Sequence, residues 1–100
     1  MINCIRTASI ATGRNHDAFA FAKKISEHFA KNYEVTLTLS MPVGGNPNRI
    51  AWMSSYSKLS DLEGLLSKMM TDQKYGELVK EYADCFISGS ISDEIWRTLA

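Results

Sequence analysis

The sequence predicts an α+β fold in which helices cover one face of a four-stranded antiparallel sheet. The first observation is the order of its periodic segments, which reads strand, helix, strand, strand, helix, strand and fills nearly all 100 residues. The second is the alternation of apolar and polar residues over 33–41, which only a strand presents as one apolar face. This order is the ferredoxin-like βαββαβ unit, and we expect residues 1–100 to form one such domain.

The first strand is expected over Ile2–Ile10, where β-branched and polar residues mix in short alternation. A turn at 12–15 follows, and Asn15 suits the N-cap of the first helix, with Asp17 favourable in its first turn. One apolar side of that helix is formed by Ala18, Ala22, Ile25 and Phe29, which recur at helical spacing.

The second strand is expected over Tyr33–Met41, and the breaker-rich residues 42–48 then form a hairpin loop. In the third strand Ile50, Trp52 and Tyr56 fall on one face. The opposite face of that strand also carries apolar bulk, from Ala51 and Met53. The sheet is therefore expected to be covered on both sides.

The second helix is expected to begin at a capping box, Ser60-Asp61-Leu62-Glu63. Thr71-Asp72 interrupts its apolar stripe and can cap a further helical segment, so this helix is predicted to be broken in two. The last strand is expected at about Phe86–Ile91, and residues 93–99 continue as a tail whose apolar side chains a single subunit leaves exposed.

Charge and composition exclude several classes of protein. Eleven basic and eleven acidic residues cancel without forming blocks, so neither nucleic acid nor a membrane surface is an expected partner. No apolar stretch reaches the roughly 20 residues of a membrane span, and the start of the chain lacks a signal-peptide pattern, which predicts a cytoplasmic protein. Cys4 and Cys85 should lie towards opposite ends of neighbouring strands, so no disulfide is expected.

The second sheet face and the tail predict self-association. One face can be covered by the helices of the same subunit, whereas the apolar residues of the other face need a second cover, which is most often another copy. A homodimer that pairs two sheets into a barrel follows. The alternative is a monomer with scattered exposed apolar residues.

Three short segments resemble NIPSNAP-like domains and the wider dimeric α+β barrel superfamily, which includes antibiotic-biosynthesis-monooxygenase-like domains. They are Ile5-Arg6-Thr7 followed by Gly13 and Phe19, residues 48–56 leading to Leu59, and the helix break at Asp72-Gln73-Lys74-Tyr75. The resemblance implies a dimer with a cleft between each sheet and its helices. Members include cofactor-independent monooxygenases, haem-degrading enzymes, isomerases and many proteins without a known reaction.

Arg6, Trp52 and Tyr56 are the candidate ligand-binding residues. A guanidinium is always charged, so a partly buried Arg6 needs a carboxylate, carbonyl groups or a ligand anion. Trp52 and Tyr56 share one strand face and could line an aromatic cleft with a polar handle. The structural alternatives are a salt bridge or an exposed edge position for Arg6, and core or dimer interface for the two aromatics.

Catalytic candidates are weak. His16 at the helix entrance and Tyr56 are the residues that could move a proton, and Asp72 and Tyr75 could also face the cleft. His16 and His28 are three turns apart, so we expect no shared metal and a surface position for each. No histidine lies between Ser57 and Cys85 to bind haem, and no cofactor is expected.

Two hypotheses remain for the function. In the first, a dimeric binding or accessory domain takes a small, mostly apolar molecule in its cleft, and where that molecule is an anion Arg6 holds its charged group. In the second, the protein is a cofactor-independent monooxygenase or isomerase in which His16 or Tyr56 removes a proton from a small activated substrate. The first hypothesis needs no catalytic group and is favoured for that reason.

Overall fold

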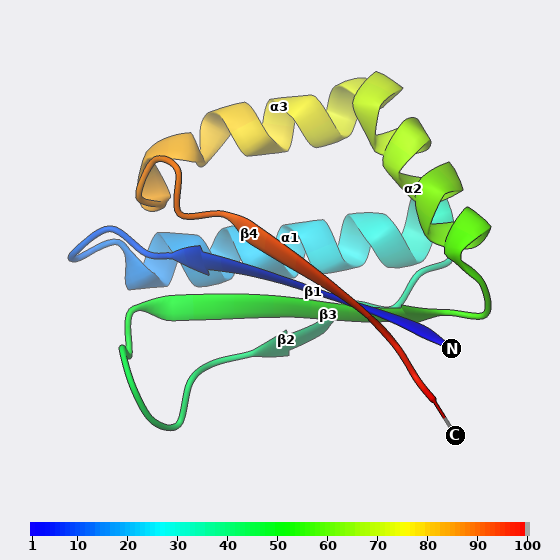
Figure 1. Cartoon of the computed structure of the whole chain (residues 1–100). Coiled ribbons are helices and arrows are strands. Elements are labelled where there is room, and N and C mark those ends of the chain that lie inside the picture. The colour runs from blue at the N-terminus through cyan, green and yellow to red at the C-terminus, as the bar shows by residue number, and fades with distance from the viewer. Residues whose placement is uncertain (100) are drawn as a thin grey trace.

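The computed structural model of the chain describes residues 1–99, and Figure 1 shows a twisted sheet with its helices on one side. The strands are β1 (Ile2–Ser9), β2 (Thr38–Ser40), β3 (Arg49–Tyr56) and β4 (Ser92–Arg97). The helical elements are α1 (Asn15–Tyr33), α2 (Leu59–Thr71), α3 (Gln73–Glu81) and the short 3-10 element η1 (Ala83–Cys85).

The sheet has the order β2-β3-β1-β4, and every neighbouring pair is antiparallel. Because the first strand lies between the third and the last, this is the α+β, ferredoxin-like βαββαβ topology that the sequence predicts. The register places Arg6 of β1 opposite Trp52 of β3 on one side and opposite Asp93 of β4 on the other. Directly paired residues point to the same face, so these three side chains share the face that the helices cover.

The first helix packs on the sheet through one apolar side. Its buried residues are Ala18, Phe21, Ala22, Ile25 and Phe29. Asn15 is its first helical residue and not its N-cap, because Arg14 holds that position and makes no side-chain capping bond. Glu34 is the C-cap of the helix, with a left-handed φ of 56°, and its N–H donates to the carbonyl oxygen of Phe29.

The second strand is much shorter than predicted. Alternation predicts a strand over 33–41, but Tyr33 ends α1 and only Thr38–Ser40 pairs with β3. Val35 and Leu37 nevertheless pack against the core as partly buried residues. An extended segment can bury every second residue without a hydrogen-bonded neighbour, so alternation alone does not determine the length of a strand.

The predicted break in the second helical stretch is confirmed at Asp72. This residue ends α2 and is also the N-cap of α3, where its Oδ1 accepts a hydrogen bond from the backbone N–H of Tyr75 at 3.1 Å. The capping box predicted at 60–63 is wrong. Lys58 holds the N-cap position of α2 and Ser60 lies inside the helix.

The last strand lies further along the chain than predicted. Phe86 forms one isolated bridge with Ile10, and the chain then turns at Gly89, whose φ of 78° favours glycine. The strand is Ser92–Arg97, inside the segment predicted as a tail. Ile95 and Trp96 within it are 51% and 57% exposed, which confirms the expectation of exposed apolar residues there.

The two cysteines lie at opposite ends of β1, as predicted. Cys4 belongs to the strand, whereas the carbonyl oxygen of Cys85 accepts a hydrogen bond from the backbone N–H of Ala11 just beyond it. Both are free thiols. No helix within residues 1–99 combines the length with the apolar composition that crossing a bilayer requires.

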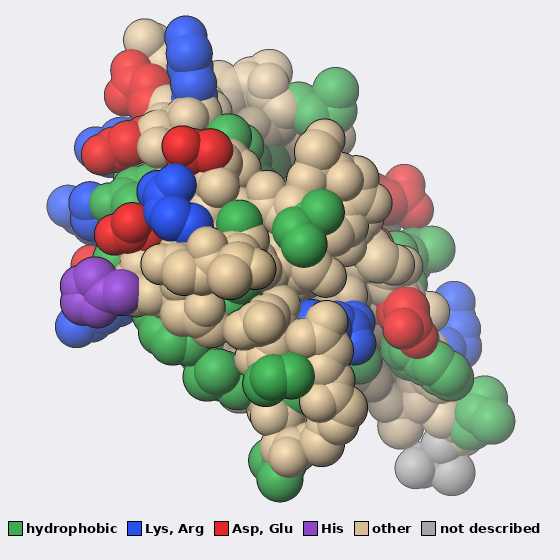
Figure 2. All heavy atoms as spheres, turned by 90° about the vertical axis from the view of Figure 1, so that its left-hand side faces the viewer, with side chains coloured by type: hydrophobic (Ala, Val, Ile, Leu, Met, Phe, Trp, Pro, Cys, Tyr) green, Lys and Arg blue, Asp and Glu red, His purple; other side chains and the backbone are tan. Residues whose placement is uncertain are grey.

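The surface near the β1–α1 turn carries charges of both signs. Figure 2 shows this end of the molecule, where basic and acidic side chains are interleaved and hydrophobic side chains form separate patches. Arg14 is part of this pattern, because it forms ion pairs with Asp17 at 3.2 Å and Asp84 at 3.3 Å. This face therefore carries no continuous basic patch in the described part of the chain.

Candidate ligand-binding cavity

A cavity of about 330 Å³ lies between the helix-covered face of the sheet and the helices. Its floor consists of side chains from β1 and β3, namely Cys4, Arg6, Ala8, Trp52, Ser54 and Tyr56. Leu37 and residues of α1, α2, α3 and the 82–91 segment form the rest of the wall, most of them aliphatic or aromatic. The cavity thus brings together Arg6, Trp52 and Tyr56, the residues that the sequence analysis selects as candidate ligand-binding residues.

Arg6 is paired with a carboxylate at the edge of this cavity. Its Nε donates to Oδ1 of Asp93 at 2.7 Å and its Nη2 donates to Oδ2 at 2.8 Å, a bidentate arrangement that fixes the plane of the guanidinium. The hydrogen bond to Asp93 raises the pKa of Arg6, and the bond from Arg6 lowers the pKa of Asp93. Both groups therefore stay charged over the physiological range of pH.

Trp52 occupies the middle of the floor and is 8% exposed. Its ring meets Phe21 edge to face, with centroids 6.2 Å apart and planes at 85°, and lies 6.0 Å from the ring of Phe86. Among the described residues, nothing accepts a hydrogen bond from its buried indole Nε1. An unpaired buried donor is uncommon in a folded protein and lies here beside the cavity.

Cys4 and Tyr56 are titratable groups in the floor, and both are shifted towards the protonated form. Burial raises the pKa of the Cys4 thiol, and the nearby Asp93 adds to the rise. Burial also raises the pKa of Tyr56, whose hydroxyl donates to the Oγ of Ser54 at 2.8 Å. At neutral pH these groups can donate a hydrogen bond but are poor bases.

The surface position expected for both histidines is confirmed for His16 only. His16 is exposed in the first turn of α1 and does not line the cavity, so the structure does not bring it to Arg6, Trp52 and Tyr56. The prediction of a surface position for His28 is wrong, since its side chain is 9% exposed and lies against the helix break. The cavity lining in the described residues therefore contains no histidine.

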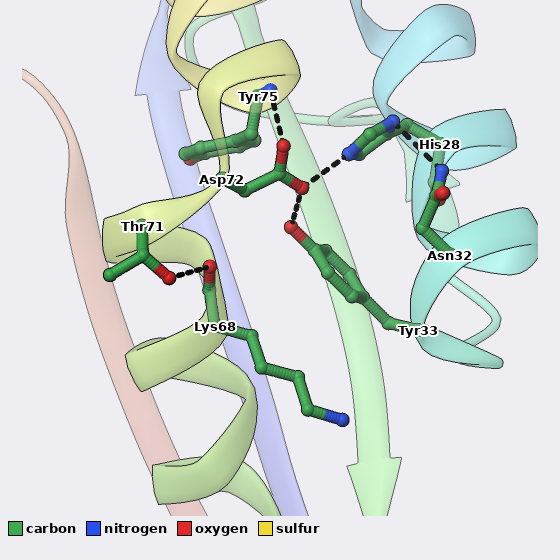
Figure 3. Close-up of polar contacts among 7 residues, drawn as sticks. All are labelled: His28, Asn32, Tyr33, Lys68, Thr71, Asp72 and Tyr75. Atoms are coloured by element: carbon green, nitrogen blue, oxygen red, sulfur yellow. Dashed lines mark hydrogen bonds and ion pairs between the residues drawn. The ribbon is translucent and has the colours of Figure 1, made fainter.

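A second polar cluster holds the helix break against α1 (Figure 3). His28 Nε2 lies 2.7 Å from Oδ2 of Asp72, and the hydroxyl of Tyr33 donates to the same oxygen. Figure 3 shows His28 and Tyr33 reaching Asp72 from α1, and the backbone of Tyr75 reaching it from α3. The bonds from Tyr33, His28 and the backbone of Tyr75 lower the pKa of Asp72, whereas burial and Asp72 raise the pKa of Tyr33.

The sequence patterns do not predict the ion pair of Asp93 with Arg6, nor the contacts of Tyr33 and His28 with the helix break. Asp93 falls in the segment predicted as a tail, although the Ser88-Gly89-Ser90 turn just before it is a recognisable signal for a following strand. Tyr33 falls in a predicted strand, where its hydroxyl could not meet the helix break. His28 has the periodicity of a residue at the edge of the apolar side of α1, which would have placed it near a packed neighbour.

No protein-family model and no curated protein matches the sequence. Solved structures do. An uncharacterized NIPSNAP domain protein from Burkholderia xenovorans matches with a TM-score of 0.83 at 13% identity, over 100% of this chain and 96% of that one. A NIPSNAP family protein with unknown function from Agrobacterium tumefaciens matches with a TM-score of 0.80 at 18% identity, over 96% and 86% of the two chains.

A candidate antibiotic biosynthesis monooxygenase from Nitrosomonas europaea has the same fold, with a TM-score of 0.75 at 15% identity over 100% of both chains. These structures are the NIPSNAP and antibiotic-biosynthesis-monooxygenase folds that the sequence resemblance indicates. A structural match at identities this low establishes a shared fold only. The activity depends on the residues of the cavity.

Proposed function

We propose that this protein binds a small, mostly apolar molecule in the cavity between its sheet and its helices, as a binding or accessory protein. The observation that carries the proposal is the cavity itself, whose volume of about 330 Å³ and largely aliphatic and aromatic lining suit a small organic ligand. Trp52 and Tyr56 offer flat apolar surface in its floor. Arg6 is the one charged side chain among the described residues of the lining.

We place this activity in a homodimer. By the register of the sheet, Ile5, Met53 and Trp96 lie on the face away from the helices, and the last two are 36% and 57% exposed. A second copy on that face would remove these side chains from water. Two free thiols in the described chain are compatible with a reducing compartment, and we place the protein in the cytoplasm.

The second candidate function is a cofactor-independent monooxygenase or isomerase. It is favoured by the fold shared with a candidate monooxygenase over the whole of both chains. Proton removal is the weak step, because Tyr56 has a raised pKa and its hydroxyl donates a hydrogen bond to Ser54, while His16 lies outside the cavity lining. The binding function needs no such base and is the better supported of the two.

The test is a titration of the protein with tetralin, a compact bicyclic hydrocarbon, followed through the indole N–H resonances in a two-dimensional NMR spectrum. Trp52 lines the cavity and Trp96 lies on the opposite face of the sheet, so the chain contains a reporter and an internal reference. We expect the Trp52 resonance to shift in a saturable way and the Trp96 resonance to stay in place. Equal shifts of both, or none, would contradict the proposal.

A matched pair of variants separates binding in the cavity from binding elsewhere. Cys4→Phe places a ring in the cavity from a residue whose side chain makes no hydrogen bond in the described structure, and it should abolish the shift of Trp52. Ile5→Phe makes a similar change one residue along the same strand, on the other face, and should leave tetralin binding unchanged.

A further inference from the structure

Arg6 is the one charged side chain in the described lining of the cavity, and its ion pair with Asp93 can select between ligands. The ligand preference inferred from this ion pair rests on the proposed binding function. Arg6 lines the cavity, whereas Asp93 stands behind it on the edge strand β4 and is not part of the lining. The two residues are register partners on the same face of the sheet, so the pair is built into the strand pairing.

The geometry of the pair leaves part of the guanidinium unused. Nε and Nη2 of Arg6 are bound to the two oxygens of Asp93, while Nη1 makes no hydrogen bond of standard geometry to residues 1–99. The N–H groups of Nη1 are therefore available to an oxygen of a ligand. Tyr75 also lines the cavity, and a weak hydrogen bond between its hydroxyl and the guanidinium is one of the smaller causes of the raised pKa of Arg6. A ligand oxygen would share the guanidinium with this hydroxyl or take its place.

The charge of the pair determines which oxygen is favoured. A free guanidinium in an apolar cavity would attract a carboxylate, but here Asp93 already neutralises it at 2.7 and 2.8 Å. A ligand carboxylate would be desolvated, would meet an ion pair with no net charge, and would be repelled by the carboxylate of Asp93. A carbonyl oxygen loses little on leaving water and still accepts a hydrogen bond from Nη1.

We propose that the cavity selects uncharged ligands with an oxygen acceptor, such as ketones, because Arg6 binds the acceptor while Asp93 cancels the charge of Arg6. Arg6 then acts as a hydrogen-bond donor and Asp93 as the residue that sets specificity against anions.

Three probes of similar shape test this inference: tetralin, the ketone α-tetralone, and the carboxylate tetrahydronaphthoate. For the wild-type protein we expect α-tetralone to bind roughly tenfold more tightly than tetralin, as expected for one added hydrogen bond from a charged donor. Tetrahydronaphthoate should bind no more tightly than tetralin. Dissociation constants come from the Trp52 indole resonance at low ionic strength.

The decisive variant is Asp93→Asn, which keeps the shape of the side chain and removes its charge. We expect it to tighten binding of tetrahydronaphthoate by roughly tenfold and to change binding of α-tetralone by less than about threefold. Asp93→Ser is a second variant with the same expectation should the asparagine variant fail to fold. Glu94→Gln is the matched control, since it removes one negative charge from the neighbouring residue on the opposite face of β4 and should leave both constants unchanged.

The outcomes separate the two proposals. If tetralin binds but α-tetralone gains nothing over it, or if Asp93→Asn leaves the carboxylate no tighter, this inference is wrong while cavity binding stands. Tighter binding of tetrahydronaphthoate than of α-tetralone by the wild-type protein would also overturn it. If none of the three probes binds to any variant, the proposed function itself fails and the selectivity fails with it.

Discussion

Nε2 of His28 lies 2.7 Å from Oδ2 of Asp72, and this contact joins α1 to the break between α2 and α3. On the other side of the ring, Nδ2 of Asn32 donates to the carbonyl oxygen of His28 at 3.0 Å and lies 3.0 Å from its Nδ1. Because a carbonyl oxygen only accepts, the amide NH₂ of Asn32 faces the ring and Nδ1 accepts from it. The ring proton therefore lies on Nε2 and points to Asp72. With both nitrogens engaged, His28 serves as a structural connection.

Removing the charge of Asp72 should destabilise the fold at neutral pH. Asp72→Asn keeps an oxygen that can cap α3 but weakens the bonds from His28 and Tyr33, and we expect a loss of about 1 to 2 kcal/mol in the free energy of unfolding. Asp72→Ala also loses the cap and should lose about 2 to 4 kcal/mol. Urea denaturation followed by circular dichroism measures both, and Asp61→Asn, at an exposed carboxylate of α2, should change stability little.

The effect of Asp72→Asn should depend on pH in a definite direction. The pKa of Asp72 is lowered in the folded protein, so its stabilisation is fully present above the ordinary pKa of about 4 and is lost as the pH falls toward the lowered value. The difference in unfolding free energy between wild type and variant should therefore narrow between pH 5 and pH 2. A difference that is constant over this range would contradict the assignment.

Tyr33 should make the fold sensitive to alkali. Burial, followed by the bond to Asp72, raises its pKa, so the phenol stabilises the fold below its ordinary pKa of about 10. That stabilisation is lost as the pH rises from there through the higher value of the folded state. Tyr33→Phe should lower the free energy of unfolding by about 1 kcal/mol at pH 7. Above about pH 10 the free energy of unfolding of this variant should fall less steeply with pH than that of the wild type. A pH titration followed by the ultraviolet absorbance of tyrosinate should show one fewer tyrosine that ionises above the ordinary pKa in this variant.

The ion pair of Arg6 and Asp93 should contribute modestly to stability. Both side chains are about one-third exposed, at 32% and 37%, so solvent screens their attraction. A double-mutant cycle with Arg6→Ala and Asp93→Ala should give a coupling free energy of about 1 kcal/mol at low ionic strength, and less in 1 M salt. A coupling that salt does not change would indicate that packing, and not charge, dominates the contact.

Self-association should depend on the open face of the sheet. Met53→Lys introduces a charge among Ile5 and Trp96, and we expect sedimentation equilibrium to show mostly monomer for this variant and dimer for wild type. Val43→Lys adds the same charge in the fully exposed hairpin loop and should remain dimeric. A wild-type protein that is monomeric at high micromolar concentration would show that the open face is not an interface.

The elements that the sequence predicts well are those in which the local signal and the packing agree. β3 begins at Arg49 and ends at Tyr56, with Trp52 buried, because its alternation coincides with pairing on both edges. The break at Asp72 is predicted for a similar reason, since the same side chain interrupts one stripe and caps the next. Arg6, Trp52 and Tyr56 meet in one cavity because the topology, once recognised, determines which faces oppose each other.

The sequence is least informative where a distant partner determines the outcome. Only the neighbour of a strand fixes its length, so alternation around Val35 extends the predicted β2 well beyond the residues that pair with β3. Likewise the pairing of β4 with β1 begins at Ser92, which places Asp93 opposite Arg6. No local sequence pattern predicts that register. The role of His28 depends in the same way on a carboxylate 44 residues further along the chain.

The sheet also has a consequence for when this chain can fold. The backbone N–H of Thr98 donates to the carbonyl oxygen of Met1 at 2.9 Å, and Figure 1 shows the two ends side by side. The central strand β1 is synthesised first and its neighbour β4 last, so a nascent chain on the ribosome holds β1 with an unpaired edge until almost all of the described residues have emerged. Completion of the sheet is therefore a late, long-range step, and a chaperone that binds nascent chains would find its target in that edge.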